Sequence, residues 1–377
     1  MRLIQMLTIV AFGDAISNHS IALRKRFEEA GVDSRIYAEA IDERVPEGIA
    51  DTLEHYTQQE GDIILYHFST GHWMNRKILE YDKAKLYLDY HNITPEKYYI
   101  GYNKGAVGNC ISAREDLRFL SDKVVGCISD SAYNRRELST IGFKCPSIVG
   151  PILISYEDYN RTPDEKVIKQ YAEDDFTNVL FVGRIVPNKR FEDVIEAFAY
   201  YQKYYNERSR LFLVGTAADT NLYYDELVHY VNRLHVKNVI FPGHISFPAI
   251  LAYYRSSDLF LCMSDHEGFC VPLVESMYFR IPIVAFDSSA VGDTLGGGGI
   301  LLKEKDPLKT AGVMHYVLTH PEVVERIKEA QASQLDKFNR EKVFDRFRRF
   351  LIDGISEENE SDPLLGGSRM DQNKDGE

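Results

Sequence analysis

Two glutamates separated by seven residues mark the part of this chain best suited to holding a polar ligand. The stretch is DHEGFCVPLVES (265–276), and the pair is Glu267 and Glu275. An ionised carboxylate accepts several hydrogen bonds, which suits sugar hydroxyl groups. Glu275 could instead be a first-turn helix residue that faces the helix dipole. Asp265, His266 and Glu267 could bind a divalent metal, but the chain has no Asp-x-Asp pair, so no metal site is expected.

A helix is predicted to begin in the middle of this stretch. Pro272 is typical of a first helical turn, and the apolar run DLFLCMS (258–264) before it is typical of a buried strand. The first N–H groups of a helix have no partner inside it and favour anions such as phosphate. The N–H groups expected to face a ligand belong to Gly268, Phe269, Cys270 and Val271.

A second candidate site follows the predicted strand NVLFVG (178–183). Gly183 ends that strand, and Arg184 and Lys189 flank a Pro-Asn turn after it. A flexible glycine followed by two cations at a strand end suits a diphosphate group. Arg184 and Lys189 could equally be ordinary surface cations.

Two positions in the first half of the chain are further candidates. His91 ends the predicted strand KLYLDYH (85–91), although a lone histidine is often only a packed residue. Gly13 lies in the strand-to-helix turn FGDAISNH (12–19), where a backbone can approach a ligand closely. This turn lacks a full Gly-x-Gly-x-x-Gly pattern, so dinucleotide binding is not expected.

Short apolar runs alternate with amphipathic stretches through most of the chain. Further strands are predicted at 3–12, 62–68, 123–129, 210–215, 238–241 and 281–286. Helical patterns lie between them, as in HSIALRKRFEEAG, FEDVIEAFAYYQKYY and LYYDELVHYVNRLH. The alternation predicts an α/β fold with parallel sheets, in which ligands bind at the carboxyl ends of the strands.

The polar, proline-containing segment 156–170 is predicted to link two α/β domains, 1–155 and 171–340. The amphipathic segment 341–354 is predicted to form a last helix. The acidic, polar tail 355–377 is predicted to be disordered.

Composition argues against several classes of protein. The 377 residues carry a formal net charge of −13, which disfavours general nucleic-acid binding. Five scattered cysteines are typical of reduced thiols. With no signal peptide and no long apolar run, we expect a cytoplasmic protein. The cluster Arg24, Lys25 and Arg26 could place it peripherally on the inner face of a membrane, or could be ordinary helix-surface cations.

The second half of the chain resembles the retaining GT-B glycosyltransferases of sequence family 4, the glycosyl transferases of group 1. The resemblance rests on GRIVPNK (183–189), GHISFPAILAYYRSSD (243–258), SDHEGFCVPLVESM (264–277) and the glycines after AVGDT (290–294). In the first half, GDAISNH, YHFSTGH and DYHNITP are similar to one bacterial and archaeal branch of the family. The resemblance implies two facing Rossmann-like domains, a cleft between them and a C-terminal helix that crosses back to the first domain.

The resemblance also implies roles around a nucleotide diphosphate sugar. Arg184 and Lys189 would hold the diphosphate, with Gly13 approaching the phosphates and Gly183 beside them. His91 would lie next to the reacting carbon of the donor sugar.

The other implied contacts concern the sugar, the ribose and the base. Glu267, with the amides of Gly268, Phe269 and Cys270, would hold the sugar hydroxyls, and Glu275 would hold the ribose. The segment around His244 and Ile245 would meet the base, and Val271 would also line the donor site. The family often has glutamate where this chain has Asp293, so no role is assigned to that position.

The expected reaction moves a sugar from a UDP- or GDP-sugar to a saccharide or lipid-linked hydroxyl, with retention at the anomeric carbon. Neither a metal nor another cofactor is expected, and the expected catalytic residues are His91, Glu267, Arg184 and Lys189. Two alternatives stay open: a nucleotide-sugar epimerase of the same architecture, and a non-catalytic nucleotide-sugar-binding subunit.

Overall fold

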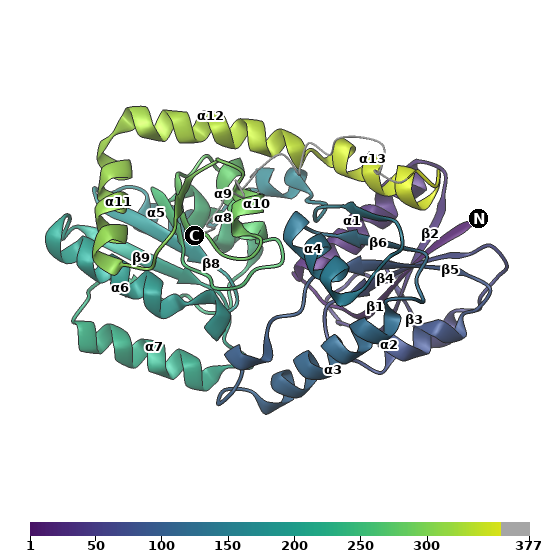
Figure 1. Cartoon of the computed structure of the whole chain (residues 1–377). Helices are drawn as coiled ribbons and strands as arrows, with labels where there is room; N and C mark the ends of the chain where they lie inside the picture. Colours follow the sequence, from purple (N-terminus) through teal and green to yellow (C-terminus); the bar gives the residue numbers. More distant parts are fainter. Residues whose placement is uncertain (356–377) are drawn as a thin grey trace, which may run out of the picture.

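The protein consists of two α/β domains side by side, joined near the middle of the chain (Figure 1). The computed structural model describes residues 1–355. The tail predicted to be disordered lies outside the described residues from 356 onward.

The first domain is built on a seven-stranded parallel sheet of order β3-β2-β1-β4-β5-β6-β7. Its central strands are largely buried because helices cover both faces of the sheet, and every residue of β4 is buried. The strands are β1 (Arg2–Val10), β2 (Asp33–Ile41), β3 (Asp51–Thr52), β4 (Ile63–Phe68), β5 (Lys85–Tyr90), β6 (Gly126–Ser129) and β7 (Ser147–Val149). The helices are α1 (Ala15–Glu29), α2 (Met74–Lys77), α3 (Lys104–Leu120) and α4 (Ala132–Ile141).

The second domain repeats this plan with a six-stranded parallel sheet of order β10-β9-β8-β11-β12-β13. The strands are β8 (Thr177–Val182), β9 (Ser209–Val214), β10 (Val239–Ile240), β11 (Leu259–Cys262), β12 (Ile283–Phe286) and β13 (Ile300–Leu302). The helices are α5 (Glu165–Tyr171), α6 (Phe191–Tyr204), α7 (Asn221–Leu234), α8 (Phe247–Arg255), α9 (Val271–Tyr278), α10 (Val291–Leu295), α11 (Pro307–Thr319) and α12 (Pro321–Lys337). The strand order reverses next to β8, which is where such sheets bind ligands.

The last helix, α13 (Arg340–Leu351), returns to the first domain, as predicted (Figure 1). Its apolar face, which includes Phe347 and Phe350, packs into a core shared with α1 and β6. Glycines permit this close approach: a Cβ at Gly126 would lie 2.8 Å from the Phe350 ring, and one at Gly150 would lie 2.8 Å from the Phe347 ring. The crossover helix therefore ties the two domains together.

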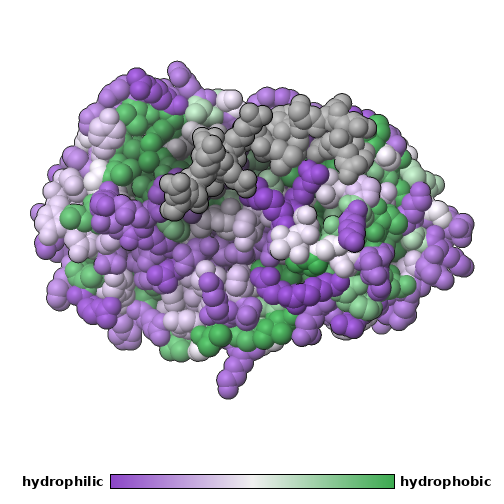
Figure 2. All heavy atoms as spheres, in the orientation of Figure 1, coloured by the Kyte–Doolittle hydropathy of each residue, from purple (hydrophilic) through white to green (hydrophobic). Residues whose placement is uncertain are grey.

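Hydrophilic side chains dominate the face of the molecule drawn in Figure 2, with smaller hydrophobic patches between them. Among residues 1–355, no helix combines the length and the apolar character that crossing a bilayer requires.

Candidate functional site

Loops from the carboxyl edges of the two sheets meet between the domains. The Ser131 hydroxyl, after β6, donates a hydrogen bond to the Gly268 carbonyl, after β11, at 2.7 Å. The Asn92 amide N–H, after β5, donates to Asn134, so its Oδ1 accepts from His266 Nε2 at 2.6 Å. The segment 265–271 therefore lies directly against the first domain, where ligands are expected in this kind of sheet.

Asp293 adds a further contact between the domains, at a position for which the sequence predicted no role. Its carboxylate accepts the Tyr133 N–H at 2.8 Å and pairs with Arg136 at 3.2 Å. Both partners belong to α4, near its N-terminus, where a carboxylate is favoured by the helix dipole.

Gly268 is a glycine because of this close approach. A Cβ there would lie 2.7 Å from the Asn92 Cβ and 3.0 Å from the His91 carbonyl oxygen, both in the other domain. We expect Gly268→Ala to force the two loops apart and to lower the Tm by several degrees. Gly108→Ala, where an added Cβ meets nothing within 4 Å, is the matched control for calorimetry. Equal Tm values for the two variants would contradict the close packing.

The hydrogen bond from His266 to Asn92 makes the contact between the domains depend on pH. Burial, helped by nearby Arg114 and Lys189, lowers the pKa of His266 to about 4, although Glu267 opposes the shift. Because the folded-state pKa lies below the unfolded value of about 6.5, stability is complete above pH 6.5 and falls as pH drops toward 4. The loss attributable to His266 is about 3 kcal/mol. Chemical denaturation at several pH values gives the free energy of unfolding of wild type and His266→Gln. The two free energies should converge as pH falls through this window, and a constant difference between them would contradict the assignment.

Lys189 and Glu267 form an ion pair at the carboxyl edge of the second sheet. Lys189 ends the short turn after β8, and its side chain passes over Gly183, where a Cβ would lie 3.8 Å from the lysine Cε. Burial disfavours the charged amine, but the Glu267 carboxylate more than offsets this effect, so the pKa of Lys189 is raised. Glu267 is 5% exposed, and its Oε1 is buried without a hydrogen-bond partner. The pair thus presents an unused acceptor beside a cation.

Helix α9 begins at Val271, next to this pair, as the sequence predicted. Cys270 occupies the N-cap position with φ of 72°, and no side chain caps the helix. Within the described residues, the N–H groups of Gly268, Phe269, Cys270 and Val271 have no hydrogen-bond acceptor. The end of α9 therefore offers donors for an anion.

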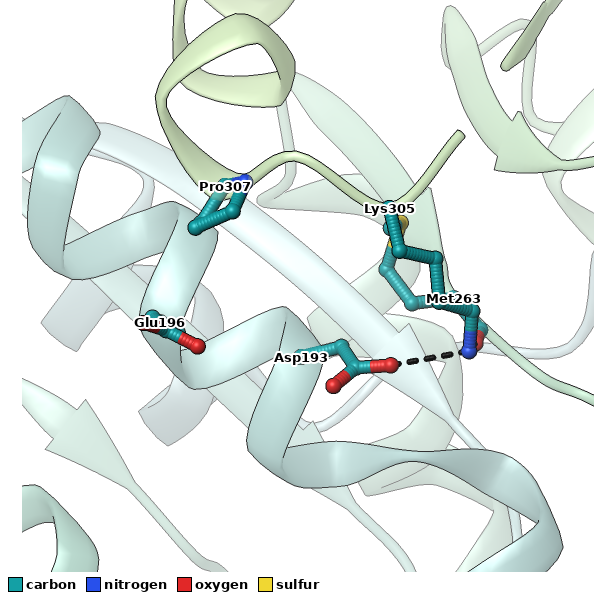
Figure 3. Close-up of a pocket in the computed structure, with 5 residues that line it drawn as sticks. All are labelled: Asp193, Glu196, Met263, Lys305 and Pro307. Carbon is teal, nitrogen blue, oxygen red and sulfur yellow. Dashed lines mark hydrogen bonds and ion pairs between the residues drawn. The ribbon is translucent and has the colours of Figure 1, made fainter. Parts of the chain in front are cut away.

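A charged cluster around Lys305 fixes the loop between β11 and α9. The Lys305 amine donates to Asp193 at 2.8 Å, to Asp265 at 2.6 Å and to the Met263 carbonyl at 2.7 Å. Figure 3 shows Lys305 pointing toward Asp193 across a small pocket that Glu196 and Pro307 also line. The cluster explains how the loop from β11 to α9 keeps its shape.

Arg184 lies apart from the Lys189–Glu267 pair. Its guanidinium is largely exposed and pairs with Asp219, in the loop after β9. The two cations predicted to hold one diphosphate therefore have different partners in this structure.

Glu275 lies one turn inside α9 and is held by two tyrosines. Its carboxylate accepts the Tyr159 hydroxyl at 2.9 Å and the Tyr254 hydroxyl at 2.6 Å. Burial raises the pKa of Glu275, and the two hydroxyls oppose that shift. Sequence reasoning missed both tyrosines, because Tyr159 comes from the segment between the domains and no local pattern connects it to Glu275.

We expect Glu275→Ala to weaken nucleotide-sugar binding about tenfold or more, because the variant loses a charged acceptor for hydroxyls. Calorimetric titration measures the effect, with Glu304→Ala, an exposed glutamate, as the control. Unchanged affinity would remove Glu275 from the donor site.

His91 is more deeply enclosed than the sequence suggested. Its ring Nδ1 bonds Asp130 at 2.9 Å, and its Nε2 faces His67 Nδ1 at 2.9 Å. Burial opposes the charged form, but Asp130 and Asp89 raise the pKa of His91 to about 9. The ring is thus not presented to the donor-side residues; what reaches Gly268 is the His91 carbonyl oxygen. A catalytic role for His91 stays a prediction.

The remaining candidate residues occupy different settings. Gly13 has φ of 78° and open space around it, so its backbone is accessible. Ile245 lies between β10 and α8, against the core of the second domain. Phe269 and Val271 pack in an apolar cluster with Ile152 and Phe338, which lie in the segments that join the domains.

Residues 163–334 match the sequence model of the family described as glycosyl transferases group 1. This segment of the chain is therefore similar to the glycosyl transferases of group 1. The match covers β8 to α12, and therefore Lys189, Glu267 and Glu275.

Curated relatives are similar to this chain over about a third to a half of their own length. The chain is 27% identical over 134 residues to a GDP-mannose-dependent alpha-mannosyltransferase of Mycolicibacterium smegmatis, covering 34% of this chain and 31% of the relative. It is 25% identical over 196 residues to an N-acetyl-alpha-D-glucosaminyl L-malate synthase of Bacillus anthracis, covering 50% and 49%.

Solved structures superpose on almost the whole chain and show its fold. HepE of Anabaena, solved in complex with UDP-glucose, superposes with a TM-score of 0.74 at 18% identity, covering 93% of this chain and 99% of that one. Sucrose-phosphate synthase of Thermosynechococcus elongatus gives 0.73 at 15%, covering 93% and 98%. The predicted GT-B fold is confirmed.

Proposed function

We propose that this chain is a glycosyltransferase that moves a sugar from a UDP- or GDP-sugar to a hydroxyl of a saccharide or lipid-linked acceptor, with retention. One observation carries the proposal. Beside the free N–H groups of α9, the buried Glu267 keeps an acceptor oxygen without a partner, and Lys189 lies against its other oxygen. Anion donors, a cation and a hydroxyl acceptor together match the parts of a nucleotide diphosphate sugar.

The donor diphosphate would bind the N–H groups of α9 and draw the Lys189 amine away from Glu267. Those donors stabilise the charge that develops on the leaving diphosphate as the bond to the sugar breaks. No metal on the diphosphate is needed for this step. Arg184 would assist by exchanging its exposed partner Asp219 for a phosphate oxygen.

Glu267, released from Lys189, would accept hydrogen bonds from the donor sugar and fix its orientation. Exact placement of the reacting carbon is worth large factors in rate. His91 would act by holding the turn that contains Asn92 against Gly268, since both of its ring nitrogens have partners in the first domain. Glu275 would bind the ribose hydroxyls in place of one of its tyrosine donors.

The comparisons support this proposal without fixing the donor. One relative is named for GDP-mannose, and one matching structure contains UDP-glucose. A test of donor binding must therefore include both UDP-sugars and GDP-sugars.

The test is thermal stabilisation of the full chain by a set of UDP- and GDP-sugars, followed by an assay for slow hydrolysis of each stabilising donor. We expect one base to raise the Tm and its sugar to be released slowly, because water can replace the acceptor. Lys189→Met should lose both effects, and Lys303→Met, an exposed lysine, should keep them. Conversion of the donor to an isomeric nucleotide sugar, or no response to any donor, would contradict transfer.

A further inference from the structure

A buried cluster of three histidines and two aspartates lies beneath the carboxyl edge of the first sheet. His67 lies on β4, Asp89 on β5, His91 directly after β5, Asp130 directly after β6, and His19 on α1. The side chains are between 0% and 4% exposed. The group 1 match begins at residue 163, so it does not account for this cluster.

Three potential ligand atoms converge on one point. His67 Nδ1 and His91 Nε2 are 2.9 Å apart, and Asp89 Oδ2 lies 3.4 Å from the first and 3.7 Å from the second. Around a tetrahedral zinc ion, ligand atoms are separated by about 3.3 Å. The mean spacing of the triad therefore suits a divalent ion.

The outer hydrogen bonds leave the correct lone pairs facing inward. Gln5 Nε2 donates to the Ser20 carbonyl, so Gln5 Oε1 accepts a proton from His67 Nε2, and His67 Nδ1 keeps a lone pair. Asp130 accepts from His91 Nδ1, which leaves His91 Nε2 as a ligand atom when the ring is neutral. A carboxylate or amide oxygen on the outer nitrogen is typical of metal-binding histidines.

The Asp89 carboxylate is prepared in the same way. His19 Nδ1 accepts the Leu153 N–H, so its Nε2 carries a proton and donates to Asp89 Oδ2 at 3.2 Å. Asp89 Oδ1 is buried and has no hydrogen-bond partner. The oxygen that faces His67 and His91 is Oδ2, and a carboxylate oxygen that accepts one hydrogen bond keeps a second lone pair for an ion.

We propose that His67, His91 and the Asp89 carboxylate bind a divalent transition-metal ion of the zinc type, with His19, Gln5 and Asp130 orienting the ligands. Imidazole and carboxylate ligands suit such ions. The ion would cross-link β4 and β5, and through the outer groups also α1, β1 and β6. It would be structural, away from the donor diphosphate, and it goes beyond the proposed transferase activity.

The test is the metal content of the full chain, purified without a histidine tag from cells grown with added zinc. We expect about one zinc ion per chain in the wild type and less than about a tenth of that in His67→Gln. His55→Gln removes an exposed histidine elsewhere in the first domain and should keep the full amount. Growth with cobalt should give the visible absorption bands of a tetrahedral Co²⁺ site in the wild type.

Asp130→Asn is a second variant for the case in which His67→Gln does not fold, because it changes only a group that orients a ligand. It should fold, shown by its circular dichroism, and bind the ion about 10- to 100-fold more weakly. A wild type that contains no metal and gives no cobalt bands would overturn the proposal, and so would equal metal in wild type and a folded His67→Gln. Both readouts are independent of transferase activity.

Discussion

Replacing Lys189 with methionine is expected to lower kcat/KM for the donor about 100- to 1000-fold. The amine pairs with Glu267, which directly precedes the free N–H groups at the start of α9, so its loss removes a positive charge that we expect to stabilise the departing diphosphate. Methionine keeps similar bulk over Gly183, which separates the effect of charge from that of packing. Steady-state kinetics with the donor found in the screen measures the change.

Lys303→Met is the control for this first prediction, since Lys303 is exposed and pairs with Asp287 outside the site. It should retain normal kinetics. A Lys189→Met enzyme with kcat/KM within about threefold of wild type would show that the diphosphate binds elsewhere.

Glu267→Gln is expected to reduce turnover about 100-fold or more, because the donor sugar loses the acceptor that orients it. It should also destabilise the free protein by about 3 kcal/mol, since the substitution leaves Lys189 as a charge without its partner. Kinetics gives the first quantity and chemical denaturation the second. Glu304→Gln, on an exposed pair, is the control for both.

The double variant Lys189→Met/Glu267→Gln separates stability from catalysis. Its loss of stability should be smaller than the sum of the two single losses, because removing both charges leaves no unpaired ion behind. Its activity should be no better than that of either single variant. Additive stability losses would mean that the two side chains do not form the observed pair.

The strands that were predicted correctly are those with continuous apolar runs, such as β4, β8 and β11. Strand β2 was missed because DSRIYAEAI mixes charged and apolar residues; its pairing with β1 over Arg2–Val10 decides its structure. Strand β13 was missed because it has only three residues and directly follows the glycine run 296–299, which is typical of a loop. In both cases sheet pairing outweighed the local pattern.

The site was predictable where one segment carries the whole signal. The spacing within 265–276 gave the start of α9 and the positions of Glu267 and Glu275 relative to it. Contacts between segments far apart in the chain were not predictable, such as that of Asn92 with His266. The burial of His91 likewise depends on His67 and Asp130, which lie on other strands.

The most direct test of the donor site is a crystal structure of the full chain with its preferred nucleotide sugar. The account predicts the diphosphate at the N-terminus of α9 with the Lys189 amine bonded to it, and a sugar hydroxyl on Glu267. A diphosphate bound away from α9, with the Lys189–Glu267 pair intact, would contradict it.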